Sequence, residues 1–144
     1  MLQEPMRSEP GEGGKGDGAK RQLLRVATEE FARNGFHGAR IDVIAALTNT
    51  GKQTIYYHYE SKFGLYAAVV AKILDSIRVF YAELRCEDFP PVEALRFFVS
   101  TTFDWYRDNE PLIRVVMDEN INFGSSAAQM HGLRDLEEPA LAAL

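Results

Sequence analysis

The hydrophobic positions along this chain repeat at helical spacing through most of its length. Leu23, Ala27 and Phe31 recur every four residues with polar residues between them, and the spacing returns at Ile41 and Ile44. Such spacing places apolar side chains on one face of a helix, whereas a half-buried strand needs strict alternation. No segment of the sequence shows that alternation. The pattern therefore predicts an all-α fold.

Turn signals divide the first half of the chain into three helices. Asn34-Gly35 ends the first, because glycine adopts a left-handed conformation at a helix end without a steric penalty. Thr48-Asn49-Thr50-Gly51 separates the second from a third at about 52–59, which buries Ile55 and Tyr59. Three short helices with a tight turn between the last two predict a helix-turn-helix arrangement.

The second half of the chain predicts longer helices. Ser61 can cap a fourth helix that continues to about Arg85, and Pro90-Pro91 then interrupts the pattern. Two more helices follow at about 92–107 and 111–121, and a last helical pattern begins near Ala127 and continues to Leu144. The helix at 92–107 is expected to face the core through Leu95, Phe98, Val99, Thr102, Phe103 and Tyr106.

Charge is distributed unevenly along the 144 residues, whose formal net charge is −5. Residues 15–62 carry eight basic and five acidic side chains, while 1–14 and 63–144 are both acidic. A local basic surface attracts phosphate even when the whole chain is acidic. The Gly- and Glu-rich residues 1–18 predict a disordered arm, followed by a DNA-binding domain at 19–66 and a helical domain at 67–144.

Composition also limits the class of protein. No apolar run is long enough for a membrane span, and the first residues do not form a secretory signal, so we expect a cytoplasmic protein. Cys86 is the only cysteine, which excludes internal disulfides and a cysteine-based zinc site. No nucleophile–base pair, metal-ligand set or phosphate loop is present. We therefore expect neither an enzyme nor a bound cofactor or metal.

The third helix carries the side chains that suit DNA. With Ile55 and Tyr59 buried, Gln53, Thr54 and Tyr57 point away from the core. Gln and Thr can exchange hydrogen bonds with base edges in the major groove, while Tyr hydroxyls and Lys ammonium groups hold phosphates. The alternative is that the helix at about 52–59 is an ordinary amphipathic helix whose Tyr and His side chains only pack or face solvent.

The chain resembles the tetracycline-repressor-like (TetR/AcrR) regulators from Ala19 to about Leu74. The resemblance is carried by Phe31-Ala-Arg-Asn-Gly-Phe36, Ile44-Ala-Ala, Lys52-Gln-Thr-Ile-Tyr-Tyr-His-Tyr59, Ser61-Lys62 and Leu65-Tyr66. It implies that Lys52, Gln53, Thr54 and Tyr57 face the groove and that Tyr56, His58 and Lys62 lie near the DNA backbone. It also implies that helices from about Phe63 onward bind an inducer and form a dimer.

Several positions depart from the family pattern. Arg40 stands where a capping Ser or Thr is usual, which removes a hydroxyl cap but supplies a charge for phosphate. Asn49, Thr50 and Gly51 replace the usual turn residues. The helical second domain also looks C-terminally incomplete, because family members normally continue for two more long helices.

These features predict a ligand-responsive transcriptional repressor that binds a palindromic DNA operator as a homodimer through the helix at about 52–59. The alternative is a helical ligand-binding or protein-interaction module without specific DNA binding. The expected DNA contacts are Arg40, Lys52, Gln53, Thr54, Tyr56, Tyr57, His58 and Lys62. The candidate contacts to a small-molecule effector are Phe103, Trp105, Arg107, Arg114 and Asn120.

Overall fold

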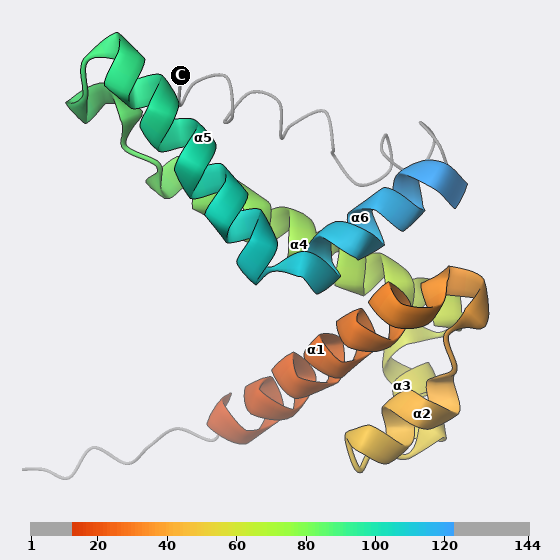
Figure 1. The fold of residues 1–144 in the computed structure, drawn as a ribbon. Coiled ribbons are helices and arrows are strands. Elements are labelled where there is room, and N and C mark those ends of the chain that lie inside the picture. The colour runs from red at the N-terminus through yellow and green to blue at the C-terminus, as the bar shows by residue number, and fades with distance from the viewer. Residues whose placement is uncertain (1–12, 123–144) are drawn as a thin grey trace, which may run out of the picture.

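A computed structural model of the chain describes residues 13–122, and every regular element in that range is helical (Figure 1). The all-α prediction is therefore confirmed. The elements are α1 (Gly13–Gly38), α2 (Ile41–Leu47), α3 (Lys52–Tyr59), α4 (Lys62–Glu83), the short 3-10 helix η1 (Cys86–Asp88), α5 (Pro91–Asp108) and α6 (Glu110–Asn122). The helical pattern noted at 127–144 lies outside the described residues.

The first three helices form the predicted helix-turn-helix arrangement. Gly35 interrupts α1 with φ 66° and ψ 175°, a conformation that favours glycine. Asn49 in the turn between α2 and α3 has φ 50°, which its short polar side chain tolerates. Helix α3 covers the range 52–59 expected from the sequence.

Helix α1 begins earlier than expected. Residues 13–18, assigned to a disordered arm from their composition, belong to the helix, which begins at Gly13. Helix propagation adds one hydrogen bond for each residue fixed, whereas nucleation fixes several residues for one bond. The packed part of α1 therefore provides a nucleus onto which the glycine-rich turns at 13–18 are added. The composition of these residues alone does not predict this extension.

Helix α4 joins the two halves of the molecule. Its first turn is capped as predicted, because the Gly64 amide donates to Ser61 Oγ at 3.0 Å. A Cβ built on Gly64 would overlap the carbonyl oxygen of Tyr59, so only glycine allows this close approach of α4 to the end of α3. The buried side chains of α4 form a stripe along the helix: Leu65, Tyr66, Val69, Val70, Ile73, Leu74, Ile77 and Tyr81.

Helix α5 lies alongside the second half of α4, away from α2 and α3 (Figure 1). Trp105 stacks on Phe80 with ring centroids 4.8 Å apart, and the hydroxyls of Tyr81 and Tyr106 are 3.0 Å apart. The prediction that α5 would turn its Leu95, Val99 and Phe103 side chains toward the core is wrong. All three are exposed, Tyr106 is 36% exposed, and Phe98 and Thr102 are half-buried.

The reason is that α5 has two apolar faces. Helical spacing identifies each of them but does not say which one meets α4. Phe97, Phe98 and Trp105 pack against the core, whereas Leu95 and Val99 belong to the other face, on which no described residue packs closely enough to bury them.

A single hydrophobic core runs through both halves of the described structure. It includes Phe31 of α1, Ile44 of α2, Ile55 of α3, Ile73 of α4 and Val115 of α6. Helix α6 packs along α1 and contacts α4, so the second half rests directly on the first (Figure 1). Within residues 13–122, no helix combines the length and the apolar character needed to cross a membrane.

Candidate nucleic-acid interface

Helix α3 presents a polar and aromatic face to solvent. Ile55 is fully buried as expected from the sequence, whereas Tyr59, expected to be buried with it, is only half-buried. Gln53, Thr54 and Tyr57 are exposed as expected, and so is His58. Tyr57 has 84% of its surface accessible. An aromatic side chain this exposed is not held there by core packing, so it is available for a partner.

The unusual turn before α3 is well supported by hydrogen bonds. The Thr50 amide donates to the carbonyl of Ala45 at 3.0 Å, and the Thr48 hydroxyl donates to the carbonyl of Ile44 at 2.8 Å. The Gly51 carbonyl then accepts the first bond of α3, from the Thr54 amide at 2.9 Å. Threonine hydroxyls and backbone groups thus stabilise the turn in place of the residues usual for the family.

A buried carboxylate fixes the start of α2. Glu30 of α1 is 7% exposed, and its Oε1 accepts a hydrogen bond from the Arg40 amide at 3.0 Å. This contact connects α1 to the N-cap residue of α2, which has no capping side chain of its own. Glu30 was not among the residues predicted from the sequence, although its position three residues after the buried Ala27 places it on the inner face of α1.

The two lysines among the predicted DNA contacts, Lys52 and Lys62, make polar side-chain contacts within the chain. Lys52 Nζ lies 2.8 Å from Asp42 Oδ1, and this exposed ion pair lowers the pKa of Asp42 and raises the pKa of Lys52, mainly through the hydrogen bond. Lys62 Nζ donates to the His37 carbonyl at 3.1 Å. Arg40 and Tyr56 are exposed. Six of the eight predicted residues lie on α3, Arg40 is the N-cap residue of α2, and Lys62 is the first residue of α4.

The predicted effector contacts are divided between separate places. Arg107 and Arg114 line one groove of about 420 Å³ together with Ile113 and Met117. Arg107 pairs with Asp104 at 2.8 Å, and Arg114 pairs with Glu110 at 2.7 Å. Trp105 is half-buried against Phe80, as described above. The side chain of Asn120 lies outside the part that the structure describes.

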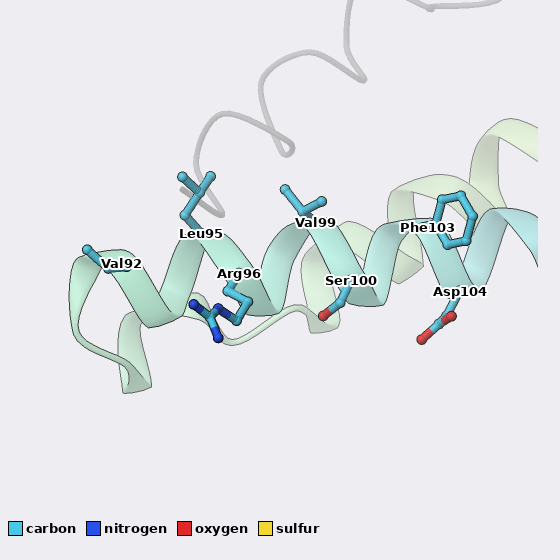
Figure 2. Close-up of a pocket in the computed structure, with 7 residues that line it drawn as sticks. All are labelled: Val92, Leu95, Arg96, Val99, Ser100, Phe103 and Asp104. Carbon is cyan, nitrogen blue, oxygen red and sulfur yellow. The ribbon is translucent and has the colours of Figure 1, made fainter.

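Phe103 belongs to a second groove, formed by the outward face of α5 alone. Figure 2 shows Val92, Leu95, Val99 and Phe103 in a row along this helix, with Arg96, Ser100 and Asp104 beside them. The groove measures about 560 Å³, and Phe103 is 67% exposed. An apolar row of this length is unusual on a solvent-facing helix and indicates a surface that binds something apolar.

Other chemistry has little support in the described residues. Between residues 13 and 122, no three His, Cys, Asp or Glu side chains are grouped so that they could hold a metal ion. Burial raises the pKa of the Cys86 thiol, which disfavours the thiolate needed for nucleophilic attack. The exposed polar face of α3 is therefore the best-formed candidate site.

Three helices, a hydrogen-bonded turn and an exposed α3 define a helix-turn-helix protein with a second helical domain. Residues 23–69 match the family described as bacterial regulatory proteins, tetR family, and residues 91–144 match the tetracyclin repressor-like C-terminal domain. Together the two matches cover well over half of the chain. The chain belongs to the TetR family of transcriptional regulators.

Two curated relatives of this chain are named as transcriptional regulators. The chain is 30% identical over 128 residues to the HTH-type transcriptional repressor NicS of Pseudomonas putida, which covers 89% of this chain and 60% of the relative. It is 35% identical over 91 residues to the HTH-type transcriptional regulator RutR of Escherichia coli, covering 62% of this chain and 42% of the relative. The chain thus spans about half the length of these relatives.

A solved structure shows the same fold. The putative transcriptional regulator SCO4942 from Streptomyces coelicolor superposes with a TM-score of 0.62 at 25% sequence identity. The superposition covers 83% of this chain and 64% of that protein. It supports both the helix-turn-helix half and the helical domain that follows it.

Proposed function

We propose that this chain is a ligand-responsive transcriptional repressor that binds a palindromic operator as a homodimer. The observation that carries the proposal is the exposed face of α3, where Gln53, Thr54 and Tyr57 project from a helix anchored by the fully buried Ile55. A helix of this kind fits the major groove of DNA, where side chains of these types reach base edges and phosphates. The names of NicS and RutR support the regulatory role.

The dimer follows from the geometry of DNA. One helix-turn-helix unit covers one half-site, and two units related by a two-fold axis cover two half-sites about 34 Å apart. Arg40, Tyr56, His58 and Lys62 are assigned to the phosphate backbone. Lys52 is assigned to the groove-facing side of α3, where its ammonium group can hold a phosphate. We place the protein in the cytoplasm, where such DNA is accessible, and assign it no catalytic activity.

The effector is proposed to be a largely apolar small molecule bound in the second domain. The exposed row formed by Leu95, Val99 and Phe103 supports this assignment, because an apolar ligand gains free energy by covering such a surface (Figure 2). Binding would shift α4, which joins both domains, and so lower the affinity for the operator.

The test is binding to DNA from the region upstream of the protein's own gene, measured by fluorescence anisotropy at several salt concentrations. We expect sequence-specific binding that weakens steeply with salt. Tyr57→Ala and Thr54→Ala should each reduce the affinity by about ten-fold, which is typical of a lost base or phosphate contact. Phe89→Ala removes an exposed aromatic side chain between α4 and α5 and should leave binding unchanged.

A verified dimer that shows no sequence preference at low salt would contradict the repressor function. The exposed apolar face of α5 would then favour the alternative, a helical ligand-binding or protein-interaction module.

A further inference from the structure

Asp118 of α6, in the second domain, makes a hydrogen bond to the DNA-binding domain in addition to the packing of α6 on α1. The backbone amide of Phe36 donates a hydrogen bond to Asp118 Oδ2 at 3.1 Å, although the two residues are 82 positions apart. Asp118 is half-buried, and Val115, three residues earlier on the same face of α6, is fully buried. The packing of α6 on α1 therefore holds this carboxylate in place.

The contact falls where α1 changes direction. Gly35 has a positive φ of 66°, and the three atoms nearest to a Cβ built on it all belong to the Asp118 carboxyl group, the closest at 3.5 Å. The carboxyl group thus lies against Gly35 and accepts the amide of the next residue. A hydrogen bond from a backbone amide to an ionised acceptor is stronger than one between neutral groups.

A second side chain holds the same turn from α4. Lys62 Nζ donates to the His37 carbonyl at 3.1 Å and lies 5.2 Å from the centre of the Phe36 ring. Phe36 and His37 are therefore held by an anion from α6 and a cation from α4. Both contacts lie within four residues of Arg40, the N-cap of α2.

The consequence for α3 follows from the chain itself. Ala39 donates to the Gly35 carbonyl at 3.1 Å, and Arg40 donates to Glu30, so the turn at residues 35–40 continues directly into α2. Helix α2 carries α3 through the tight turn at 48–51. A change at residues 35–36 therefore alters the direction in which both helices leave α1.

We propose that Asp118 is a positioning residue for DNA binding: its carboxylate, carried by the second domain, holds the Gly35–Phe36 turn and thereby the orientation of α2 and α3. The inference rests on the proposed function and adds to it the contact by which the second domain acts on α3. A ligand that displaces α6 breaks this hydrogen bond, and DNA favours the arrangement in which it is intact.

The experiment compares Asp118→Ala and Asp118→Asn with Asp75→Ala in the full chain. Asp75 is exposed on α4 and pairs only at the surface, with Arg78 at 3.3 Å, so its replacement controls for the loss of one carboxylate. The first measurement is hydrogen exchange of the amides at 36–41. The second is affinity for the duplex that the wild type selects from a random-sequence library, with thermal unfolding recorded for each variant.

We expect Asp118→Ala to accelerate exchange at 36–41 and to weaken binding of the selected duplex by roughly ten-fold, as the loss of a partly buried charged hydrogen bond would. Asp118→Asn keeps an oxygen acceptor and should recover most of both properties. Asp75→Ala should match the wild type.

Unchanged exchange or unchanged affinity in Asp118→Ala would overturn the inference, and so would an Asn variant as impaired as the Ala variant. A wild-type chain that selects no duplex contradicts the proposed function and with it the role in DNA binding. Faster exchange in Asp118→Ala would then still show that the carboxylate holds the turn.

Discussion

Asp42 places a negative charge among the cations of the surface proposed to face DNA. Its carboxylate lies 2.8 Å from the ammonium of Lys52, and this contact lowers its pKa, so Asp42 stays ionised throughout the neutral range. The pair is exposed, and its contribution to stability is accordingly small. Asp42 should have a larger effect on the binding of phosphate, because it both neutralises Lys52 and repels an approaching DNA backbone.

Asp42→Asn is therefore expected to raise DNA affinity severalfold. With Lys52 released to a phosphate, the slope of log affinity against log salt concentration should become steeper by about one. Anisotropy titrations at several salt concentrations measure both quantities. Asp75→Asn makes the same chemical change on α4 and should affect neither. Equal or weaker binding by Asp42→Asn would show that Asp42 does not compete with DNA for Lys52.

Single residues differ in how far the sequence can predict their roles. The positive φ of Asn49 and the cap supplied by Ser61 were predictable, because each depends on neighbours within three residues. The exposed face of α3 was predictable from its spacing alone. Glu30 and Asp118 were not, because their partners lie 10 and 82 residues away, and a charged residue on a buried helix face does not indicate which backbone amide it meets.

Among the elements, α5 is the helix that the sequence predicted least well. Its bounds were close to those expected, but its apolar residues cover two faces, and hydrophobic spacing gives no preference between them. Large aromatic rings determine which face of α5 meets α4. Trp105 stacks on Phe80, and Tyr81 stacks on Phe98 with ring centroids 6.1 Å apart. The orientation of α3 was easier to predict, because only Ile55 of its eight residues is fully buried.

The contact between α4 and α5 should make stability depend on alkaline pH. Burial, followed by the hydrogen bond with Tyr106, raises the pKa of Tyr81. The folded state therefore keeps the hydroxyl proton of Tyr81 above a pH of about 10, where the unfolded chain loses it. The stability that this group contributes is fully present below that pH and is lost as the pH rises above it.

Tyr81→Phe should flatten this alkaline loss of stability. At pH 7 it should cost about 1 kcal/mol, the usual contribution of one hydrogen bond. Urea unfolding at pH 7 to 11 measures both effects. Tyr57→Phe serves as the matched control because the Tyr57 hydroxyl is on an exposed side chain. A Tyr81→Phe profile parallel to that of the wild type would contradict the link between the Tyr81 hydroxyl and alkaline stability.

At the scale of the whole molecule, the two halves share one core, and we expect them to unfold together. Trp105, the only tryptophan, reports on the second domain, whereas Ile44 is fully buried in the first. Ile44→Ala should destabilise the protein by roughly 2–5 kcal/mol. Because the core is continuous, the midpoint recorded by Trp105 fluorescence should shift as far as that recorded by circular dichroism.

The matched control is Leu47→Ala on the same helix, where the leucine is 64% exposed and little stability should be lost. If Ile44→Ala shifted the circular dichroism midpoint but left Trp105 fluorescence unchanged, the halves would be separate folding units.

The junction between α3 and α4 consists of only Glu60 and Ser61, so the two helices move almost as one piece. Helix α4 has 22 residues and is therefore roughly 33 Å long at 1.5 Å per residue. A tilt of about five degrees about its far end displaces its near end by roughly 3 Å, close to the ~3.4 Å spacing of successive bases along a DNA strand. A tilt of only a few degrees would thus be enough to move α3 by about one base step.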